Sequence, residues 1–195
     1  MSRRVEQGQA TRQALIDTAK RLFAERGYEA TSVDAVLELA SVSRGALYHH
    51  FENKRALFEA VLDSVEAEVA ERIAGEAAHA EDPVEALRQG CSAWLAMARD
   101  PVIQRIALID APSVVGWERW REIDSRHGFG LMKAALAGAA ADGRVEPESV
   151  DVLAHMLLAA LIEVALLIAR SDDPRSARES GENAVDELLG RLLGV

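Results

Sequence analysis

Hydrogen-bond donors and small residues are concentrated in a short stretch of the chain between residues 43 and 54. The residues concerned are Ser43, Arg44, Gly45, Ala46, Tyr48, His49, His50 and Lys54. Arginine can donate two parallel hydrogen bonds to the edge of a guanine, whereas hydroxyl, imidazole and ammonium groups suit phosphate oxygens. The small side chains of Gly45 and Ala46 would allow close approach of the backbone. The stretch therefore predicts a DNA contact, in which Arg44 reads a base or neutralises a phosphate and Tyr48 and Lys54 bind phosphates.

Metal chemistry and nucleophilic catalysis are poorly supported by the same residue types. His49 and His50 are adjacent, so on a helix they would point about 100° apart and could hardly share one ion. The nucleophile–base pair that can be assembled is Cys91 or Ser92 with His155, without a nucleophile elbow or a glycine-rich phosphate loop. We expect no metal, no cofactor and no enzymatic activity, and an all-helical enzyme is the least favoured alternative.

Two short helices, at about 32–40 and 44–50, would position the donor side chains. Thr31 or Ser32 can cap the first helix and Ser43 can cap the second, because their hydroxyls accept bonds from first-turn amides. Thr31 and Ser32 are also expected among the DNA-contacting residues. The three-residue turn between the two helices predicts a helix-turn-helix.

The spacing of apolar residues decides which face of the second helix is exposed. Leu47 and Phe51 lie four residues apart and would be buried on one face. Arg44, Tyr48 and His49 would then face outward, as is required of a helix that enters a major groove.

The stretch from about residue 11 to residue 58 resembles the DNA-binding domain of the tetracycline-repressor (TetR) family of ligand-responsive repressors. The matching residues are Gly27-Tyr28, Thr31-Ser32, Val42-Ser43, Gly45, Leu47-Tyr48, His50-Phe51, Asn53-Lys54 and Leu57. Two positions depart from the family pattern, which usually has glycine in place of Ser41 and alanine in place of Leu37. If the backbone needs a positive φ at Ser41, serine there costs roughly 1 kcal/mol.

The resemblance implies a fold and a mode of action for the whole chain. Members of the family are homodimers whose C-terminal helices pack as a four-helix interface. Their bodies hold a small-molecule pocket, and ligand binding changes the separation of the two DNA-reading heads so that they leave their operator. The partners implied are pseudo-palindromic double-stranded DNA, a small-molecule effector and a second copy of the chain.

The composition predicts an all-α fold. Apolar residues make up 49% of the 195 residues and aromatic residues 5%, which favours helices packed on helices. Proline with a preceding acidic residue marks several helix starts. The expected nine helices lie at about 9–26, 32–40, 44–50, 54–75, 83–99, 101–110, 113–141, 147–170 and 174–193.

A change in helix length and in charge predicts two domains. Residues 1–54 form the expected helix-turn-helix domain, the helix at about 54–75 bridges the two, and residues 55–195 form a ligand-binding and dimerisation domain. The chain carries a net charge of −10, but residues 1–55 hold nine Lys and Arg against seven Asp and Glu. The acidic charge therefore lies in the body, and a DNA-binding head is compatible with it.

Bulky and adaptable side chains of the body are candidates for an effector pocket. They are Trp94, Met97, Trp117, Trp120, Phe129, Met132, His155 and Met156. Walls of this kind suit a mainly apolar ligand. His155 or Glu163 could anchor a polar group of the ligand, or either could be satisfied within the core or the dimer interface.

Two C-terminal helices are too apolar for one chain to cover comfortably, so a homodimer interface is expected there. Its candidate residues are Leu157, Leu161, Val164, Ala165, Ile168, Val185, Leu188, Leu189 and Leu192. The stretch 153–169 is interrupted by His155 and Glu163 and is interpreted as a buried core helix rather than a membrane span. Without an apolar leader near residue 1, a cytoplasmic protein is expected. An activator, or a DNA-binding protein that needs no ligand, remains an alternative to the repressor.

Overall fold

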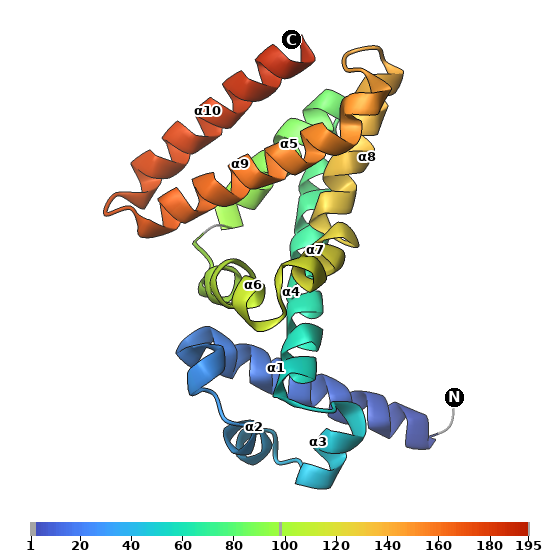
Figure 1. Cartoon of the computed structure of the whole chain (residues 1–195), viewed down its shortest axis with the longest axis vertical. Coiled ribbons are helices and arrows are strands. Elements are labelled where there is room, and N and C mark those ends of the chain that lie inside the picture. The colour runs from blue at the N-terminus through green and yellow to red at the C-terminus, as the bar shows by residue number, and fades with distance from the viewer. Residues whose placement is uncertain (1–2, 98, 195) are drawn as a thin grey trace. The chain divides into compact units, whose positions relative to one another are not determined.

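The computed structural model describes residues 3–97 and 99–194, with side chains from residue 5 onward, and over these residues it is helical without a strand (Figure 1). In chain order the elements are α1 (Arg3–Ala30), α2 (Val33–Ala40), α3 (Arg44–His50), α4 (Lys54–Ala77), α5 (Pro83–Met97), η1 (Ile103–Asp110), α6 (Ala111–Val114), α7 (Trp117–Ser125), α8 (Gly128–Ala141), η2 (Pro147–Ser149), α9 (Val150–Arg170) and α10 (Pro174–Leu193). The all-α prediction is confirmed.

The chain forms two compact units. Unit 1 comprises residues 1–65 and 101–120, and unit 2 comprises residues 66–100 and 121–195. The sequence interpretation assigned residues 101–120 to the second domain, whereas in the structure they cluster with the head.

Unit 1 is built on one buried face of α1. Leu15, Ala19, Leu22 and Phe23 on this face are fully or almost fully buried, as the helical spacing of these apolar residues requires. The ring of Phe23 meets the edge of Phe58 from α4 with centroids 5.2 Å apart. α2 and α3 both pack against α1, so a single core supports the helix-turn-helix.

The segment that joins α5 to α7 within unit 1 contains a π-helix. η1 packs against α1 and continues directly into α6. The predicted boundary between helices at 101–110 and 113–141 is wrong, because the helix continues through Val114. Pro112 lies inside this continuous helical stretch, directly after the π-helical turns, and the Ser113 hydroxyl donates to the Asp110 carbonyl at 2.9 Å.

Unit 2 is organised around α9, which packs against α5, α8 and α10. The two C-terminal helices approach closely at Gly181 of α10. A Cβ added there would come within 2.6 Å of Cγ1 of Val164 on α9. Glycine at this position therefore sets the spacing between α9 and α10.

Two helix breaks in the body were not predicted, and two predicted helix starts are confirmed. The single helix expected at 113–141 is three helices, because Gly116 adopts φ 83° and a turn separates α7 from α8 at residues 126–127. The helix starts at Pro83 and Pro174 are as predicted. Asp82 accepts from the first-turn amides of α5, and Asp173 accepts from Ser176 in α10.

Candidate functional site

In the turn of the helix-turn-helix, Ser41 adopts a positive φ, the conformation that the family's usual glycine at this position favours. Ser41 lies in the left-handed region with φ 54° and ψ 39°, and no other non-glycine residue in the described chain has a positive φ. Its N–H donates to Glu38 and that of Val42 donates to Leu37, which closes the end of α2. Ser43 then accepts from Ala46 at 3.3 Å and starts α3.

α3 presents its donors as the spacing predicted. Leu47 and Phe51 are buried at 0% and 4% exposure, whereas Tyr48 on the opposite side is 47% exposed. Arg44, Gly45 and His49 are exposed beside it, and Ala46 and His50 are half-buried. The exposed donors Arg44, Tyr48 and His49 form the donor ridge of α3, and the buried side chains of Leu47 and Phe51 hold the helix against the core of unit 1.

Arg44, the expected base reader, forms an ion pair with Asp34 of α2. Both side chains are well exposed, so the pair is solvated and easily exchanged for a stronger partner. The spacing of ten residues between Asp34 and Arg44 gave no sign of the contact, because it depends on how the turn folds α3 back onto α2.

The structure corrects the expected roles of Thr31 and Ser32. Thr31 is 1% exposed, and its hydroxyl donates to the carbonyls of Gly27 and Leu22 at 2.8 and 3.2 Å. A side chain buried in this way has no surface for DNA. Ser32 is exposed and caps α2 by accepting from Ala35 at 3.1 Å, so the capping role falls to Ser32 rather than to Thr31.

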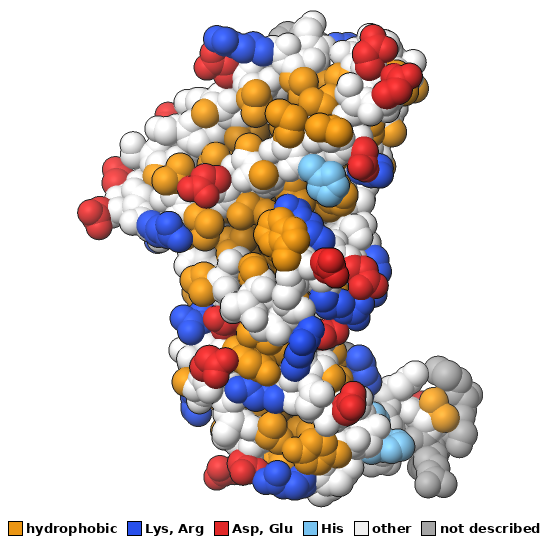
Figure 2. All heavy atoms as spheres, in the orientation of Figure 1, with side chains coloured by type: hydrophobic (Ala, Val, Ile, Leu, Met, Phe, Trp, Pro, Cys, Tyr) orange, Lys and Arg blue, Asp and Glu red, His pale blue; other side chains and the backbone are white. Residues whose placement is uncertain are grey.

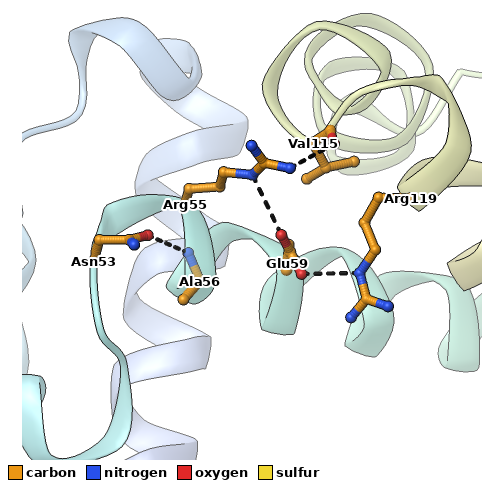
Figure 3. Close-up of polar contacts among 6 residues, drawn as sticks. All are labelled: Asn53, Arg55, Ala56, Glu59, Val115 and Arg119. Atoms are coloured by element: carbon orange, nitrogen blue, oxygen red, sulfur yellow. Dashed lines mark hydrogen bonds and ion pairs between the residues drawn. The ribbon is translucent and has the colours of Figure 1, made fainter.

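Lys54 opens α4 at a place that disfavours positive charge, since the N-terminal end of a helix is itself positive. Its Nζ lies 3.9 Å from the centroid of the Tyr28 ring, a cation–π contact that holds the ammonium in position. The preceding Asn53 caps the helix by accepting from Ala56 at 2.9 Å (Figure 3). Burial, with the nearby charges of His49 and Arg12, lowers the pKa of His50, which makes it a weaker cationic phosphate contact.

A polar cluster ties α4 to the segment 101–120 within unit 1. Arg55 donates to the Val115 carbonyl at 2.7 Å, and Glu59 accepts from Arg55 at 3.3 Å and from Arg119 at 3.0 Å (Figure 3). Neither the composition nor the motifs of the sequence indicate this cluster. Only the four-residue spacing of Arg55 and Glu59 could have suggested part of it.

The residues expected to line an effector pocket are divided between the two units. Trp117 and Trp120 belong to unit 1, with ring centroids 5.0 Å apart. The other six lie in unit 2, where Met97 and Phe129 are buried, Trp94 and Met132 are half-buried, and His155 and Met156 are exposed. Among the six residues in unit 2, Phe129 and His155 form a ring contact, with centroids 4.7 Å apart.

Asp124 is a buried carboxylate of unit 2 that sequence reasoning did not single out. It is 7% exposed, and burial raises its pKa to about 6 despite the Arg121 guanidinium 3.4 Å away and the opposing charges of His127 and His155. A polar group of this kind among apolar side chains is suited to orient a ligand.

The expected dimer interface needs a correction in its residues. Those buried within unit 2 itself are Leu157, Leu161, Ala165, Ile168, Val185 and Leu189. A side chain already covered by its own chain has little surface to offer a partner. Val164 and Leu192 are half-buried, and Leu188 is 44% exposed.

The exposed face of α9 nevertheless carries large apolar side chains, and Glu163, four residues before Leu167, is exposed on the same face. Val152, Met156 and Leu167 are 60%, 62% and 59% exposed, and Figure 2 shows apolar side chains gathered over this helix. By length and hydropathy the stretch 147–170 could cross a membrane, and one third of it is buried inside the chain. The prediction of a buried core helix therefore holds for one face only.

Cys91 is buried, and the described residues form no metal-binding cluster. Burial raises the pKa of the Cys91 thiol to about 12, which leaves no thiolate nucleophile. No group of three or more His, Cys, Asp or Glu in that part of the chain could hold a metal ion.

Comparison with known proteins agrees with this geometry over both units. Residues 15–61 match the family "Bacterial regulatory proteins, tetR family", and residues 84–192 match "Tetracyclin repressor-like, C-terminal domain". A solved TetR-family transcriptional regulator from Pectobacterium atrosepticum is 36% identical, with 99% of this chain and 98% of that chain covered and a TM-score of 0.78. The TetC protein of transposon Tn10 from Escherichia coli is 26% identical over 165 residues, which cover 83% of this chain and 81% of the relative. RolR, solved in complex with resorcinol, shares the fold at 19% identity and a TM-score of 0.73, over 95% of this chain and 90% of that chain.

Proposed function

The chain belongs to the tetracycline-repressor family of bacterial regulatory proteins, and we propose that it represses transcription by placing α3 in the major groove of a pseudo-palindromic operator. It is a DNA-binding regulator that responds to a small molecule, and it is not an enzyme. The observation that carries the proposal is the exposed donor ridge of α3 above buried Leu47 and Phe51. Arg44 would read a base edge, and Tyr48, His49 and Lys54 would hold phosphates.

The homodimer is proposed to form through the outer face of α9 together with α10. Val152, Met156 and Leu167 supply exposed apolar area on α9, and Leu188 adds to it on α10. A two-fold axis would pair this face with itself, so one patch serves both protomers. The two α3 helices would then read half-sites about one DNA turn apart, which is about 34 Å.

The effector is proposed to be small and mainly apolar, bound in unit 2. Support comes from the apolar and aromatic side chains of Trp94, Met97, Phe129 and Met132. The contact of Phe129 with His155 and the buried Asp124 provide polar groups that could orient one substituent. The resorcinol complex of RolR is consistent with a small aromatic compound. As a DNA-binding regulator the protein is proposed to act in the cytoplasm.

The test is direct measurement of operator binding after selection of the operator from random duplexes. Tyr48→Ala and Lys54→Ala are expected to weaken binding at every sequence, and Lys54→Ala, which removes a cation, is also expected to reduce the dependence of binding on salt. Arg44→Ala is expected in addition to relax the preference at one position of each half-site. Arg175→Ala, which removes the same charge from exposed α10, is the matched control and should bind normally. Unchanged binding by all three head variants would refute the proposal.

Repressor and activator differ in a second measurement. A reporter with the selected operator between promoter and gene should be silenced by the protein and relieved by the effector. Stimulation of the reporter from an upstream operator would favour the activator alternative.

A further inference from the structure

The end of α1 is held by a carboxylate that lies far away in the sequence but within the same unit. The backbone N–H of Tyr28 donates to Oδ2 of Asp110 at 2.8 Å, across 82 residues. Asp110 is the last residue of η1 and is 8% exposed. Nε of Arg105 donates to the same oxygen at 3.3 Å.

The backbone at Gly27 explains why this acceptor is needed. Gly27 has φ 81° and ψ 167°, a combination that is essentially restricted to glycine. The chain turns out of the helix there, so the N–H of Tyr28 loses its partner in the preceding turn. A buried backbone donor without an acceptor is costly, and Asp110 supplies the acceptor.

The Tyr28 side chain carries the effect of this bond onward to the DNA-facing side of unit 1. Its ring packs edge-on against Phe58, with centroids 5.2 Å apart, and the Lys54 ammonium lies 3.9 Å from its centroid. α4 itself is anchored separately, through Arg55 and Glu59. A shift of Tyr28 would therefore move the Lys54 ammonium while the helix that carries it stays in place.

We propose that Asp110 is a positioning residue for operator binding, which fixes Tyr28 and through its ring sets the position of the Lys54 ammonium against a DNA phosphate. The inference rests on the proposed phosphate contact of Lys54 and extends it to a residue of the segment 101–120. That segment belongs to the same unit as the helix-turn-helix.

The experiment is a double-mutant cycle on operator binding across a salt series. In a dimer with two heads, Lys54→Gln should reduce the slope of log K against log salt by about 2 and weaken binding by about tenfold or more at 0.15 M salt. Asp110→Ala should produce a loss of the same kind. The double variant should bind no more than about threefold more weakly than the weaker single variant, because coupled residues are not additive.

Two further variants separate positioning from a general loss of stability. Asp110→Asn keeps an acceptor for Tyr28 and should retain affinity within about threefold, since one amide oxygen can replace the carboxylate oxygen. Ile16→Val removes a buried methyl group of unit 1 and should lower the thermal midpoint without changing the salt slope. If Asp110→Ala does not fold, Tyr28→Leu replaces it in the cycle, with Tyr28→Phe as the variant that keeps the ring.

The possible failures are distinguishable. If Lys54→Gln weakens binding but Asp110→Ala leaves the slope unchanged, or if the two losses add in full, the positioning role is overturned and the proposed function stands. If Tyr28→Leu replaces Asp110→Ala, an unchanged slope or full additivity overturns the role in the same way. If Lys54→Gln changes neither affinity nor slope, the phosphate contact and the inference built on it both fail.

Discussion

The two units of this chain are stabilised in different ways, and the difference decides how readily their functional residues can be recognised. In unit 1, particular side chains satisfy particular backbone groups, as Ser32, Ser43 and Thr31 do around α2 and α3. In unit 2, apolar faces of α5, α8, α9 and α10 cover one another. Functional residues of the head therefore stand out by type, whereas those of the body are the apolar residues that packing leaves uncovered.

The largest expected effect follows from that view of the body. Met156→Glu and Leu167→Glu place a charge in the proposed dimer interface twice, once from each protomer, and should weaken dimerisation by about 1,000-fold or more, about 4 kcal/mol. Analytical ultracentrifugation measures the change. Leu131→Glu on α8, where the side chain is 38% exposed, is the matched control and should remain dimeric. If both α9 variants dimerise normally, the outer face of α9 is not the interface.

The buried carboxyl group of Asp124 makes the stability of unit 2 depend on pH. Its pKa is raised to about 6 from an ordinary value of 3.8, so between these values the folded chain binds the proton more tightly than the unfolded chain does. The stability contributed by Asp124 is therefore present at low pH and is lost as the pH rises through about 6. Relative to Asp124→Asn, the wild type should gain up to about 3 kcal/mol between pH 7.5 and pH 4.

The measurement for Asp124 is urea unfolding of both proteins at one fixed concentration. Effects of pH on all other groups are shared by the two proteins and cancel in the difference. A difference that stays constant over this pH range would show that Asp124 is ionised with an ordinary pKa.

In the head, stability depends on the backbone conformation of a single residue, Gly27. Gly27→Ala should destabilise unit 1 by about 2 kcal/mol, because alanine is strained at φ 81° and ψ 167°. Gly75→Ala, in a helical stretch of α4 with open space around a new Cβ, should instead stabilise the chain by about 0.5–1 kcal/mol. Thermal unfolding followed by circular dichroism compares the two, and equal effects of the same sign would contradict the argument.

The smallest expected effect concerns the surface ion pair of the head. Asp34→Asn releases Arg44 and removes a negative charge next to the proposed DNA face, so operator affinity should rise by about three- to tenfold, about 1 kcal/mol. Fluorescence anisotropy at 0.15 M salt measures it, and Asp17→Asn, which removes a charge from α1, is the control. Weaker binding by Asp34→Asn would instead indicate that Asp34 orients Arg44 toward its base.

The sequence was sufficient for the architecture of the head and for most of its exposed face. Helical spacing placed Leu47 inward and Tyr48 outward, and Ser41, where the family usually has glycine, adopts the positive φ whose cost was considered for it. The sequence was insufficient to predict the role of Thr31. The hydroxyl of a residue next to a helix start can either cap that helix or donate to a carbonyl of the preceding turn. Only the break at Gly27 decides between the two.

In the body the sequence predicted helices but not their faces. Leucine and alanine serve equally in a core and in an interface, so the apolar run of α9 could not show that Leu161 is buried and Leu167 exposed. Long-range contacts such as that of Tyr28 with Asp110 depend on the tertiary fold and leave no periodic signal. The same holds for the π-helix, whose residues are ordinary helix formers.

The burial of Cys91 has a practical consequence for observing this protein at work. The chain contains one cysteine, and its thiol is buried and protonated, so maleimide reagents should not react with it in the folded state. A cysteine introduced at exposed His49 would then carry the label on its own. Spin or fluorescent probes attached there would report the distance between the two reading helices of a dimer directly in the absence of DNA.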